Sequence, residues 1–332
     1  MNLDAIQERL AHIYADEDAA EVTSLTQLTD GWENEVFAFT LQTANAERDL
    51  ILRIYPGNDA VEKAAREFRA MQKLYMRGFP VPEVLRLATE DSPFGHPYVI
   101  MEKINGRSLG DVFGESRPAE QQRLLTAFCQ HFVNLHALDK RFFAEERIEG
   151  DVWIARRFAH MRTGIALHKK PDFLPLLEWL ENRRANIGPL HLCMTHGDYH
   201  PHNVLVTSDG QMYVIDWCNA AIADYRYDLA WTLLLIHTYS GRAPRDSILN
   251  EYERLRSSSV PHIDYFEVAA AFRRLFGIAV SLSGGAEQAG MRPGAEALMT
   301  QNLTHLKNVH NLVVNMTGIE IPEISRLICR YG

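Results

Sequence analysis

Residues 192–220 read LCMTHGDYHPHNVLVTSDGQMYVIDWCNA, and this stretch decides the predicted fold. It opens on apolar residues, continues with a polar cluster that contains Asp198 and Asn203, and ends near a second acid, Asp216. Between the cluster and that acid, VLVT predicts a strand, SDG a turn and MYVID a second strand. Since the strands of a hairpin run side by side, we expect the cluster and Asp216 to lie close together.

The two acids and the amide of this hairpin suit phosphoryl transfer. That reaction needs a carboxylate that orients and deprotonates the attacking hydroxyl, and oxygen ligands for Mg²⁺ that neutralise charge on the phosphates. Asp198 is the candidate base, and Asn203 and Asp216 are the candidate metal ligands. The spacing D-x-x-x-x-N is also that of the protein-kinase catalytic loop. The simpler interpretation is that these are turn residues that cap local backbone groups.

The same loop allows a second interpretation, in which it holds a metal for a hydrolase. Histidine or aspartate occupies every second position: His196, Asp198, His200 and His202. On a strand these side chains would share one face and could bind zinc or iron. Pro201 opposes this because it disrupts a regular strand. We expect His196 to orient the loop, while His200 and His202 could be polar fillers or face a substrate.

The order of patterns along the chain predicts an α+β architecture. From about Ser24 to Tyr55 the sequence is strand-like, a helix is expected over residues 60–77, and a second strand pair over residues 84–104. After Gly106 helical patterns dominate, with the hairpin region as a short β-rich interruption. The clearest of these helical patterns cover residues 118–138 and 172–186.

Length and charge restrict the class of protein. A chain of 332 residues is long for one compact core, so two lobes are expected. The formal net charge is −9 and no Lys/Arg-rich run occurs, which argues against nucleic-acid binding. An acidic surface slightly favours a cationic substrate, but a net negative charge is more often explained by solubility alone.

The cysteines and the N-terminus indicate a cytoplasmic protein. The four cysteines form no C-x-x-C pair, which disfavours a zinc ribbon or a disulfide framework: Cys129, Cys193, Cys218 and Cys329. The first ten residues lack the basic start and apolar core of a signal peptide. The densest apolar run, Leu229 to Ile236, is too short to span a bilayer, so no membrane partner is expected.

The motif H-G-D-x-x-x-x-N with a downstream I-D-W resembles the aminoglycoside phosphotransferase and choline-kinase-like family. The resemblance covers about residues 20–240. It implies a bilobal protein-kinase-like fold with a small β-rich N-terminal lobe and a larger, mainly helical C-terminal lobe. Residues 1–103 would form the nucleotide-binding lobe, and residues 104–332 the catalytic and substrate-binding lobe.

The resemblance also implies roles for residues outside the hairpin. Residues 28–37, LTDGWENEVF, resemble the loop that covers the nucleotide, and VIMEKINGRSL is similar to the hinge between the lobes. Arg53 stands where kinase-like folds place a phosphate-contacting lysine, and Glu67 where they place its acidic partner; by themselves the two could form a surface ion pair. The nucleotide-binding residues so implied are Gly31, Asn34, Arg53, Glu67, Glu102 and Ile104.

The activity implied by the resemblance is the transfer of the γ-phosphoryl group of ATP, with Mg²⁺, to a hydroxyl of a small molecule. Two departures from the family pattern are arginine at position 53 and D-W-C after the second strand. The acceptor stays open among antibiotics, sugars, choline and amino-acid derivatives, as does the oligomeric state. A nucleotide-binding pseudokinase is the alternative; a protein kinase is disfavoured because no D-F-G…A-P-E segment occurs. Asp228 is expected either to accept hydrogen bonds from the loop or to cap a helix.

Overall fold

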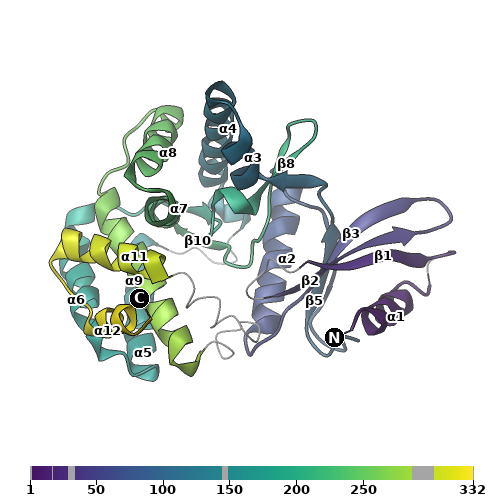
Figure 1. The fold of residues 1–332 in the computed structure, drawn as a ribbon, viewed down its shortest axis with the longest axis horizontal. Helices are drawn as coiled ribbons and strands as arrows, with labels where there is room; N and C mark the ends of the chain where they lie inside the picture. The colour runs from purple at the N-terminus through teal and green to yellow at the C-terminus, as the bar shows by residue number, and fades with distance from the viewer. Residues whose placement is uncertain (1, 17, 29–33, 144–148, 286–302, 332) are drawn as a thin grey trace. The chain divides into compact units, whose positions relative to one another are not determined.

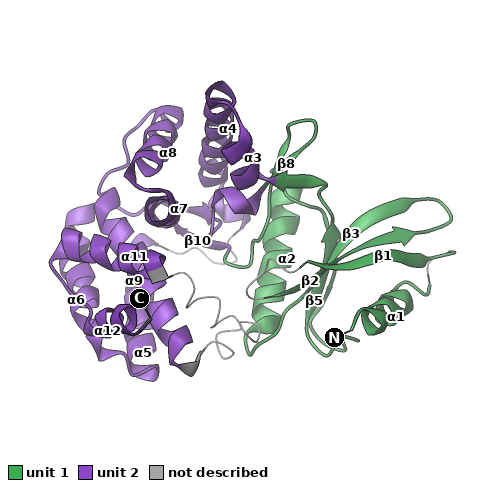
Figure 2. Ribbon diagram, viewed as in Figure 1, with its two compact units in different colours: residues 1–107, 205–219, 285–295 green, residues 108–204, 220–284, 296–332 purple. Residues whose placement is uncertain are grey.

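The computed structural model describes residues 2–16, 18–28, 34–143, 149–285 and 303–331 (Figure 1). The chain divides into two compact units, which Figure 2 colours separately. Unit 1 contains residues 1–107 and 205–219, and unit 2 contains residues 108–204, 220–284 and the C-terminal helices. The candidate residues on either side of the predicted hairpin are therefore divided between the units: Asp198 and Asn203 belong to unit 2, and Asp216 belongs to unit 1.

Unit 1 is built on an antiparallel five-stranded sheet with the strand order β1-β2-β3-β5-β4. The strands are β1 Glu21–Leu28, β2 Glu35–Gln42, β3 Glu47–Ile54, β4 Val84–Ala88 and β5 Tyr98–Glu102. In the central strand β3, burial alternates with a period of two, so that Leu50, Leu52 and Ile54 enter the core. Helix α1, Leu3–Ile13, adds Ile6 and Leu10 to this core. Arg53 consequently points to the opposite face of the sheet from its neighbours in β3.

Helix α2, Ala60–Met76, buries one stripe of side chains at helical spacing, and Glu67 lies within that otherwise apolar stripe. The helix ends where the sequence predicts, since Gly78 takes a left-handed φ of +70° and two prolines follow. A smaller sheet of unit 1 has the order β6-β8-β9, with β6 Gly106–Ser108, β8 Val204–Thr207 and β9 Met212–Val214. The Val214 amide donates to the Pro80 carbonyl at 2.8 Å, which joins this sheet to the segment after α2.

Unit 2 is mainly helical. Its helices are α3 Leu109–Glu115, α4 Pro118–Ala137, α5 Gly150–Leu167, α6 Leu174–Arg183, α7 Tyr225–Ser240, α8 Arg242–Arg256, α9 Ile263–Val280, α11 Leu303–Thr317 and α12 Pro322–Tyr331. A two-stranded antiparallel sheet pairs β7 Leu192–Thr195 with β10 Ala221–Asp224. Helix α7 is buried along most of its length and packs on α8, α9 and α11. It is the central helix of unit 2, directly after β10.

Short 3-10 turns connect several of these elements. They are η1 Lys140–Phe142, η2 Pro171–Phe173, η3 Arg184–Ile187 and η4 Pro201–Asn203; a π-helical turn, Ser281–Gly285, follows α9. The helix predicted over residues 172–186 is divided among η2, α6 and η3, because prolines at 171 and 175 set its first turns. The strands and helices predicted between residues 24 and 138 are confirmed within a few residues at their ends.

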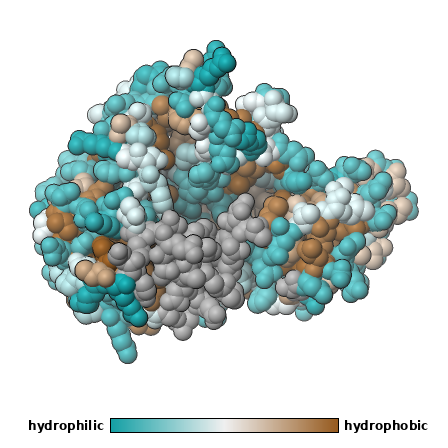
Figure 3. Space-filling model, in the orientation of Figure 1, coloured by the Kyte–Doolittle hydropathy of each residue, from teal (hydrophilic) through white to brown (hydrophobic). Residues whose placement is uncertain are grey.

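The observed order agrees with the predicted α+β class, a β-rich first part and a mainly helical remainder. A lobe boundary between residues 103 and 104 stays a prediction. Figure 3 shows small apolar patches among hydrophilic side chains on each unit. None of the described helices combines the length and the apolar character that a membrane-spanning helix needs.

Gly106 of β6 has no room for a side chain, since an added Cβ would lie 2.9 Å from the Val206 carbonyl oxygen. We expect Gly106→Ala to lower the free energy of unfolding by about 1–3 kcal/mol because backbone must move. Gly114, exposed near the end of α3, is the control: a Cβ there meets nothing within 4 Å. Gly114→Ala should be about 0.5–1 kcal/mol more stable than wild type. Urea denaturation of both variants measures the difference, and equal midpoints would contradict the expectation.

Candidate active site

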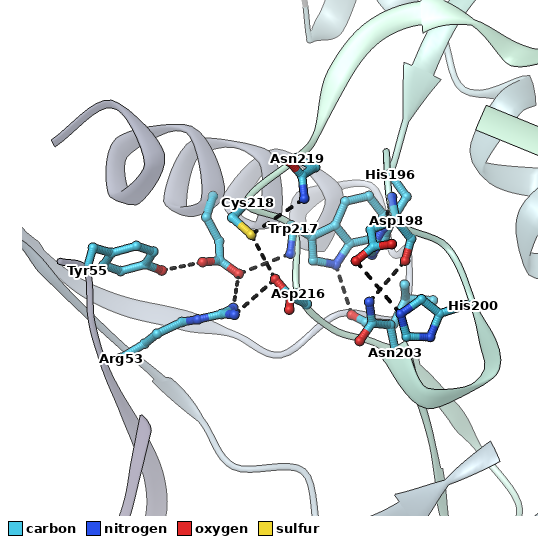
Figure 4. A network of polar contacts seen from close by, with 12 residues as sticks. Arg53, Tyr55, His196, Asp198, His200, Asn203, Asp216, Trp217, Cys218 and Asn219 are labelled. Atoms are coloured by element: carbon cyan, nitrogen blue, oxygen red, sulfur yellow. Dashed lines mark hydrogen bonds and ion pairs between the residues drawn. The ribbon is translucent and has the colours of Figure 1, made fainter. Parts of the chain in front are cut away.

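Arg53 of β3 contacts two acids and one amide within unit 1, and Figure 4 shows its contact with Asp216. Its Nη1 donates to Oε1 of Glu67 at 2.6 Å, and its Nη2 lies 2.9 Å from Oδ1 of Asp216. With its amide oxygen toward the guanidinium, Asn34 accepts from Nε at 2.9 Å and from Nη2 at 3.2 Å. The Arg53 side chain is only 13% exposed, so its pair with Glu67 is not a surface ion pair. One N–H of Nη1 is left over by these contacts.

Glu67 is the acceptor on which this cluster converges. Its carboxylate is fully buried and accepts from Arg53, from the Tyr55 hydroxyl and from the Trp217 amide, the last at 3.0 Å. Burial raises the pKa of Glu67, and the charge of Arg53 opposes that rise. Burial also disfavours the charge on Arg53, but the carboxylates of Asp216 and Glu67 outweigh it and raise the pKa of the guanidinium well above its ordinary value. Arg53 is therefore a permanent cation.

Asp216 follows β9 in a left-handed conformation with φ +66°, which is uncommon for a residue with a side chain. The residues around it are anchored. Trp217 is fully buried, donates from its indole to the Val214 carbonyl at 2.9 Å and meets Phe79 edge-on at 5.8 Å. The Cys218 thiol lies 2.9 Å from Oδ1 of Asp216. In the D-W-C sequence, the buried Trp217 thus fixes the backbone next to Asp216, and the Cys218 thiol contacts the Asp216 carboxylate.

Asp198 of unit 2 lies in the loop after β7, and its carboxylate is held from the side. The indole Nε1 of Trp231 in α7 donates to Oδ1 at 2.6 Å, and Nε2 of His200 lies 3.8 Å from Oδ2. The Asn203 amide nitrogen donates to the Asp198 carbonyl at 3.0 Å. The D-x-x-x-x-N spacing therefore lets Asn203 close the loop by a hydrogen bond to Asp198. The amide nitrogen of Asn203 makes this bond, so its amide oxygen is not used by it.

Asp228 of α7 holds the backbone of the same loop. Its buried carboxylate accepts from the amides of His196 and Gly197, each at 2.8 Å, and from Nε2 of His136 at 3.2 Å. Burial pushes the pKa of Asp228 upward, but the contacts with His136 and His196 outweigh it and lower the pKa. The helix cap is instead Asp224, which accepts from the Arg226 amide. Of the two roles expected for Asp228, the structure assigns the hydrogen bonds to the loop.

The three loop histidines have different surroundings, so they do not present one metal-binding face. His196 is fully buried, and its Nδ1 accepts from the Asp198 amide at 3.2 Å, which orients the loop as predicted. His202 lies against α3, with Nδ1 3.2 Å from the Ser108 hydroxyl. Among the described residues, no group of three or more His, Cys, Asp or Glu side chains is arranged to hold a metal ion. The hydrolase interpretation of this loop therefore finds no support.

The predicted hinge residues lie at the end of β5. The Glu102 amide donates to the Glu83 carbonyl at 2.8 Å, and the Glu102 carboxylate accepts from the Glu83 amide at 3.2 Å. The Ile104 carbonyl accepts from the Gly106 amide at 3.1 Å. Contact of Glu102 and Ile104 with adenine stays a prediction. Gly31, predicted for the nucleotide-covering loop, lies outside the described residues.

Sequence reasoning missed three residues that support the site. The sequence assigned no role to Tyr55, to Trp231 or to Arg273 of α9. Arg273 donates to the Gly197 carbonyl at 2.7 Å and stacks 3.9 Å from the centre of the Trp231 ring. Trp231 and Arg273 each contact a partner more than 30 residues away, so no local sequence signal could have found them. Tyr55 lies 12 residues from Glu67, which is also beyond the reach of a local pattern.

A family model settles the classification. The model described as "Phosphotransferase enzyme family" matches residues 24–269, which include every candidate residue of both units. The chain belongs to the phosphotransferase enzyme family. The family was predicted from the H-G-D-x-x-x-x-N loop, and this prediction is confirmed.

Relatives of this phosphotransferase-family chain include longer proteins. It is 26% identical over 295 residues to acyl-CoA dehydrogenase family member 10 of Mus musculus, covering 78% of this chain and 26% of the mouse protein. With acyl-CoA dehydrogenase family member 11 of Rattus norvegicus it shares 26% identity over 289 residues, 79% of this chain and 36% of the rat protein. The chain thus spans about a quarter to a third of the length of these curated relatives.

Solved structures confirm the kinase-like fold. A thermostable mutant of the aminoglycoside phosphotransferase APH(4)-Ia, in a ternary complex with ADP and hygromycin B, matches with a TM-score of 0.62 at 19% identity. The match covers 94% of this chain and 99% of that one. Plasmodium vivax ethanolamine kinase matches with a TM-score of 0.65 at 12% identity, over 97% and 89% of the two chains.

Removing the Glu67 carboxylate should be strongly destabilising, because Arg53 and two further donors would lose their buried acceptor. We expect Glu67→Ala to lower the free energy of unfolding by about 3–5 kcal/mol. Glu62→Ala, on the same helix, is the matched control, since the Glu62 side chain is 75% exposed and lies 3.9 Å from Arg66. That change should cost at most about 1 kcal/mol. Chemical denaturation measures both, and similar losses would contradict the assignment.

The lowered pKa of Asp228 predicts how its contribution depends on pH. A carboxylate whose pKa is lower in the folded state stabilises the fold above its unfolded pKa, about 3.9, and that contribution is lost as the pH falls through the folded value. The difference in unfolding free energy between wild type and Asp228→Asn should therefore be largest near neutral pH and narrow below about pH 4. Urea titrations at pH 7, 5 and 3 test this. A difference that stays constant across the three would contradict it.

Proposed function

We propose that this chain transfers the γ-phosphoryl group of ATP to a hydroxyl group of a small molecule. The observation that carries the proposal is the loop from His196 to Asn203, in which an indole N–H fixes one carboxylate and an amide five residues later closes the loop. Membership of the phosphotransferase family supports it. So does the likeness to a phosphotransferase solved with ADP and hygromycin B, a hydroxyl-bearing small molecule.

In the proposed reaction Asp198 acts as the general base. Its carboxylate accepts the hydroxyl proton of the acceptor, the acceptor oxygen forms a bond to the γ-phosphorus, and the bond from that phosphorus to the bridging oxygen of ADP breaks. Trp231 fixes Oδ1 of Asp198, which leaves Oδ2 as the oxygen for the acceptor proton. Positioning of the two substrates and neutralisation of phosphate charge would supply most of the rate enhancement.

The donor set fits Mg²⁺, which prefers carboxylate and amide oxygens. Asp216 supplies a carboxylate, and Asn203 supplies an amide oxygen because its nitrogen is used by the Asp198 carbonyl. When bound, the ion would neutralise charge on the phosphates of ATP. That these two residues, one in each unit, hold the same ion stays a prediction.

Arg53 is proposed as the cation that contacts the phosphates, in place of the lysine of kinase-like folds. Glu67 and Asn34 occupy three of its donor positions, so their proposed role is to fix the guanidinium while an N–H of Nη1 remains for a phosphate oxygen. Arg53 also pairs with Asp216. A metal ion bound to Asp216 would therefore either displace the Arg53 guanidinium from this carboxylate or bind its other oxygen. Glu102 and Ile104 are proposed to lie near adenine.

Two further points stay predictions. The acceptor is a small molecule with a hydroxyl group rather than a nucleic acid, and the protein acts in the cytoplasm, as its dispersed cysteines suggested. The alternative is a nucleotide-binding pseudokinase with a sensing or scaffolding role. The complete set of Asp198, Asn203 and Asp216 favours the enzyme. ATP-dependent thermal stabilisation without turnover on any acceptor would favour the pseudokinase.

Loss of the base tests the proposed function. We expect Asp198→Ala to lower the rate of ADP release with Mg-ATP and an acceptor panel by at least about a hundredfold, because the hydroxyl proton loses its acceptor. The fold should persist, since Asp198 is partly exposed and packs at a loop. Asp209→Ala, at the exposed turn between β8 and β9, is the control and should keep wild-type activity. Full activity in purified Asp198→Ala protein would overturn the mechanism.

A further inference from the structure

Arg157 of α5 is a partly buried cation that has no acidic partner in the part of the chain that the structure describes. Its guanidinium carbon lies 3.7 Å from the centre of the Tyr227 ring and 5.7 Å from that of Trp153. Among the described residues, no carboxylate lies within 4.0 Å of it, whereas Arg53, Arg226 and Arg245 each pair with an acid. Since inward-facing arginines are usually paired, this one has binding capacity that the fold does not use.

A second arginine adds to the positive charge at this place. Burial lowers the pKa of Arg157, and the charge of Arg273 lowers it further, to about 9. Two like charges held near each other repel. A bound anion would reduce this repulsion and would also offset the cost of removing the Arg157 guanidinium from water. The aromatic faces of Tyr227 and Trp231 beneath the two guanidinium groups keep them in fixed positions, 3.7 and 3.9 Å away.

A buried hydroxyl without a partner lies in the same cluster. The phenolic oxygen of Tyr227 has no hydrogen-bond partner among the described residues, although the side chain is only 6% exposed. Such a group normally finds an acceptor, because leaving it unpaired in the interior is unfavourable. The unpartnered hydroxyl is independent of the charge argument, and it indicates that the cluster is built for a group that is not part of the chain.

This cluster is linked to the proposed base by direct contacts within unit 2. Arg273 donates to the Gly197 carbonyl at 2.7 Å, next to Asp198 in the chain, and stacks on Trp231. Trp231 in turn donates to the Asp198 carboxylate at 2.6 Å. A small molecule bound at the arginines would therefore lie on the same side of unit 2 as the group that takes its hydroxyl proton.

We propose that Arg157, with Arg273 and the hydroxyl of Tyr227, binds an oxyanion group of the acceptor, a carboxylate or a phosphate, so that the acceptor is a hydroxylated anion. This rests on the proposed function and deepens it. It reverses the slight preference for a cationic acceptor that the net charge of −9 suggested, because local charge at a site outweighs the average over the surface. Arg157 is the specificity residue; Arg273 also holds the loop, and Trp231 positions the base.

The experiment compares acceptors that differ only in the anion. Release of ADP with Mg-ATP is measured on hydroxy acids against their amides, on sugar phosphates against the free sugars, and on an aminoglycoside and ethanolamine as cationic acceptors. The proposal expects kcat/KM for the anionic member to exceed that for its neutral partner by at least about tenfold, since a site built for a charged hydrogen-bonding group rejects analogues without it. The arms separate carboxylate from phosphate.

Matched variants assign the preference to the arginine. In Arg157→Gln the anion preference should fall to about one, through a higher KM for the acceptor, while KM for ATP stays unchanged. Arg156→Gln is the control: this neighbour is exposed and should keep the wild-type preference. Arg157→Lys keeps the charge and should restore part of the preference. Circular dichroism and thermal melting confirm that each variant is folded.

Anion binding without turnover is measured independently. With saturating Mg-AMP-PNP, malonate and inorganic phosphate at constant ionic strength should stabilise wild type and Arg156→Gln against heat more than Arg157→Gln. Equal stabilisation of all three proteins would overturn the proposed site, as would a preference for neutral or cationic acceptors that Arg157→Gln leaves unchanged. Either result leaves the proposed function standing if Asp198→Ala still abolishes turnover. Conversely, full activity in Asp198→Ala overturns the proposed mechanism, whatever the anion preference.

Discussion

The arrangement of unit 1 depends on one buried carboxylate. Glu67 has no exposed surface, and such a charge is tolerated only where donors surround it. Its donors come from β3 through Arg53 and Tyr55, and from the segment after β9 through Trp217. The acid therefore sets the position of Arg53, the proposed phosphate-contacting cation. It also fixes Trp217 and, one residue earlier, the candidate metal ligand Asp216.

Unit 2 uses a second buried carboxylate in the same way. Asp228 collects two backbone amides of the loop before Asp198 and a histidine side chain. Because α7 carries both Asp228 and Trp231, one helix holds the backbone of the loop and the carboxylate of the proposed base, Asp198. The chemistry proposed for the D-x-x-x-x-N loop thus depends on a helix that begins more than twenty residues later.

Local patterns predicted much of this protein because their causes are local. Period-two burial in β3 and the helical stripe of α2 follow from backbone geometry, so the strand and the helix expected at these residues are observed. The proline and glycine signals after α2 marked its end correctly. The D-x-x-x-x-N spacing and the surrounding motifs also led to the phosphotransferase family, which the family model confirms. Helix ends near residue 172 were less accurate, because prolines there permit several short turns.

The sequence alone predicted the fold class and the family correctly, and it proposed Asp198, Asn203 and Asp216 as the reacting residues. The distant side chains that hold these three residues in place became known from the tertiary structure. Trp231 reaches Asp198 across 33 residues, and Arg273 reaches Gly197 across 76. That no acid of the described residues pairs with Arg157 is likewise a property of packing, not of any motif. The physical reason is that periodicity and spacing report only on neighbours in the chain, whereas burial, charge pairing and hydrogen bonding depend on neighbours in space.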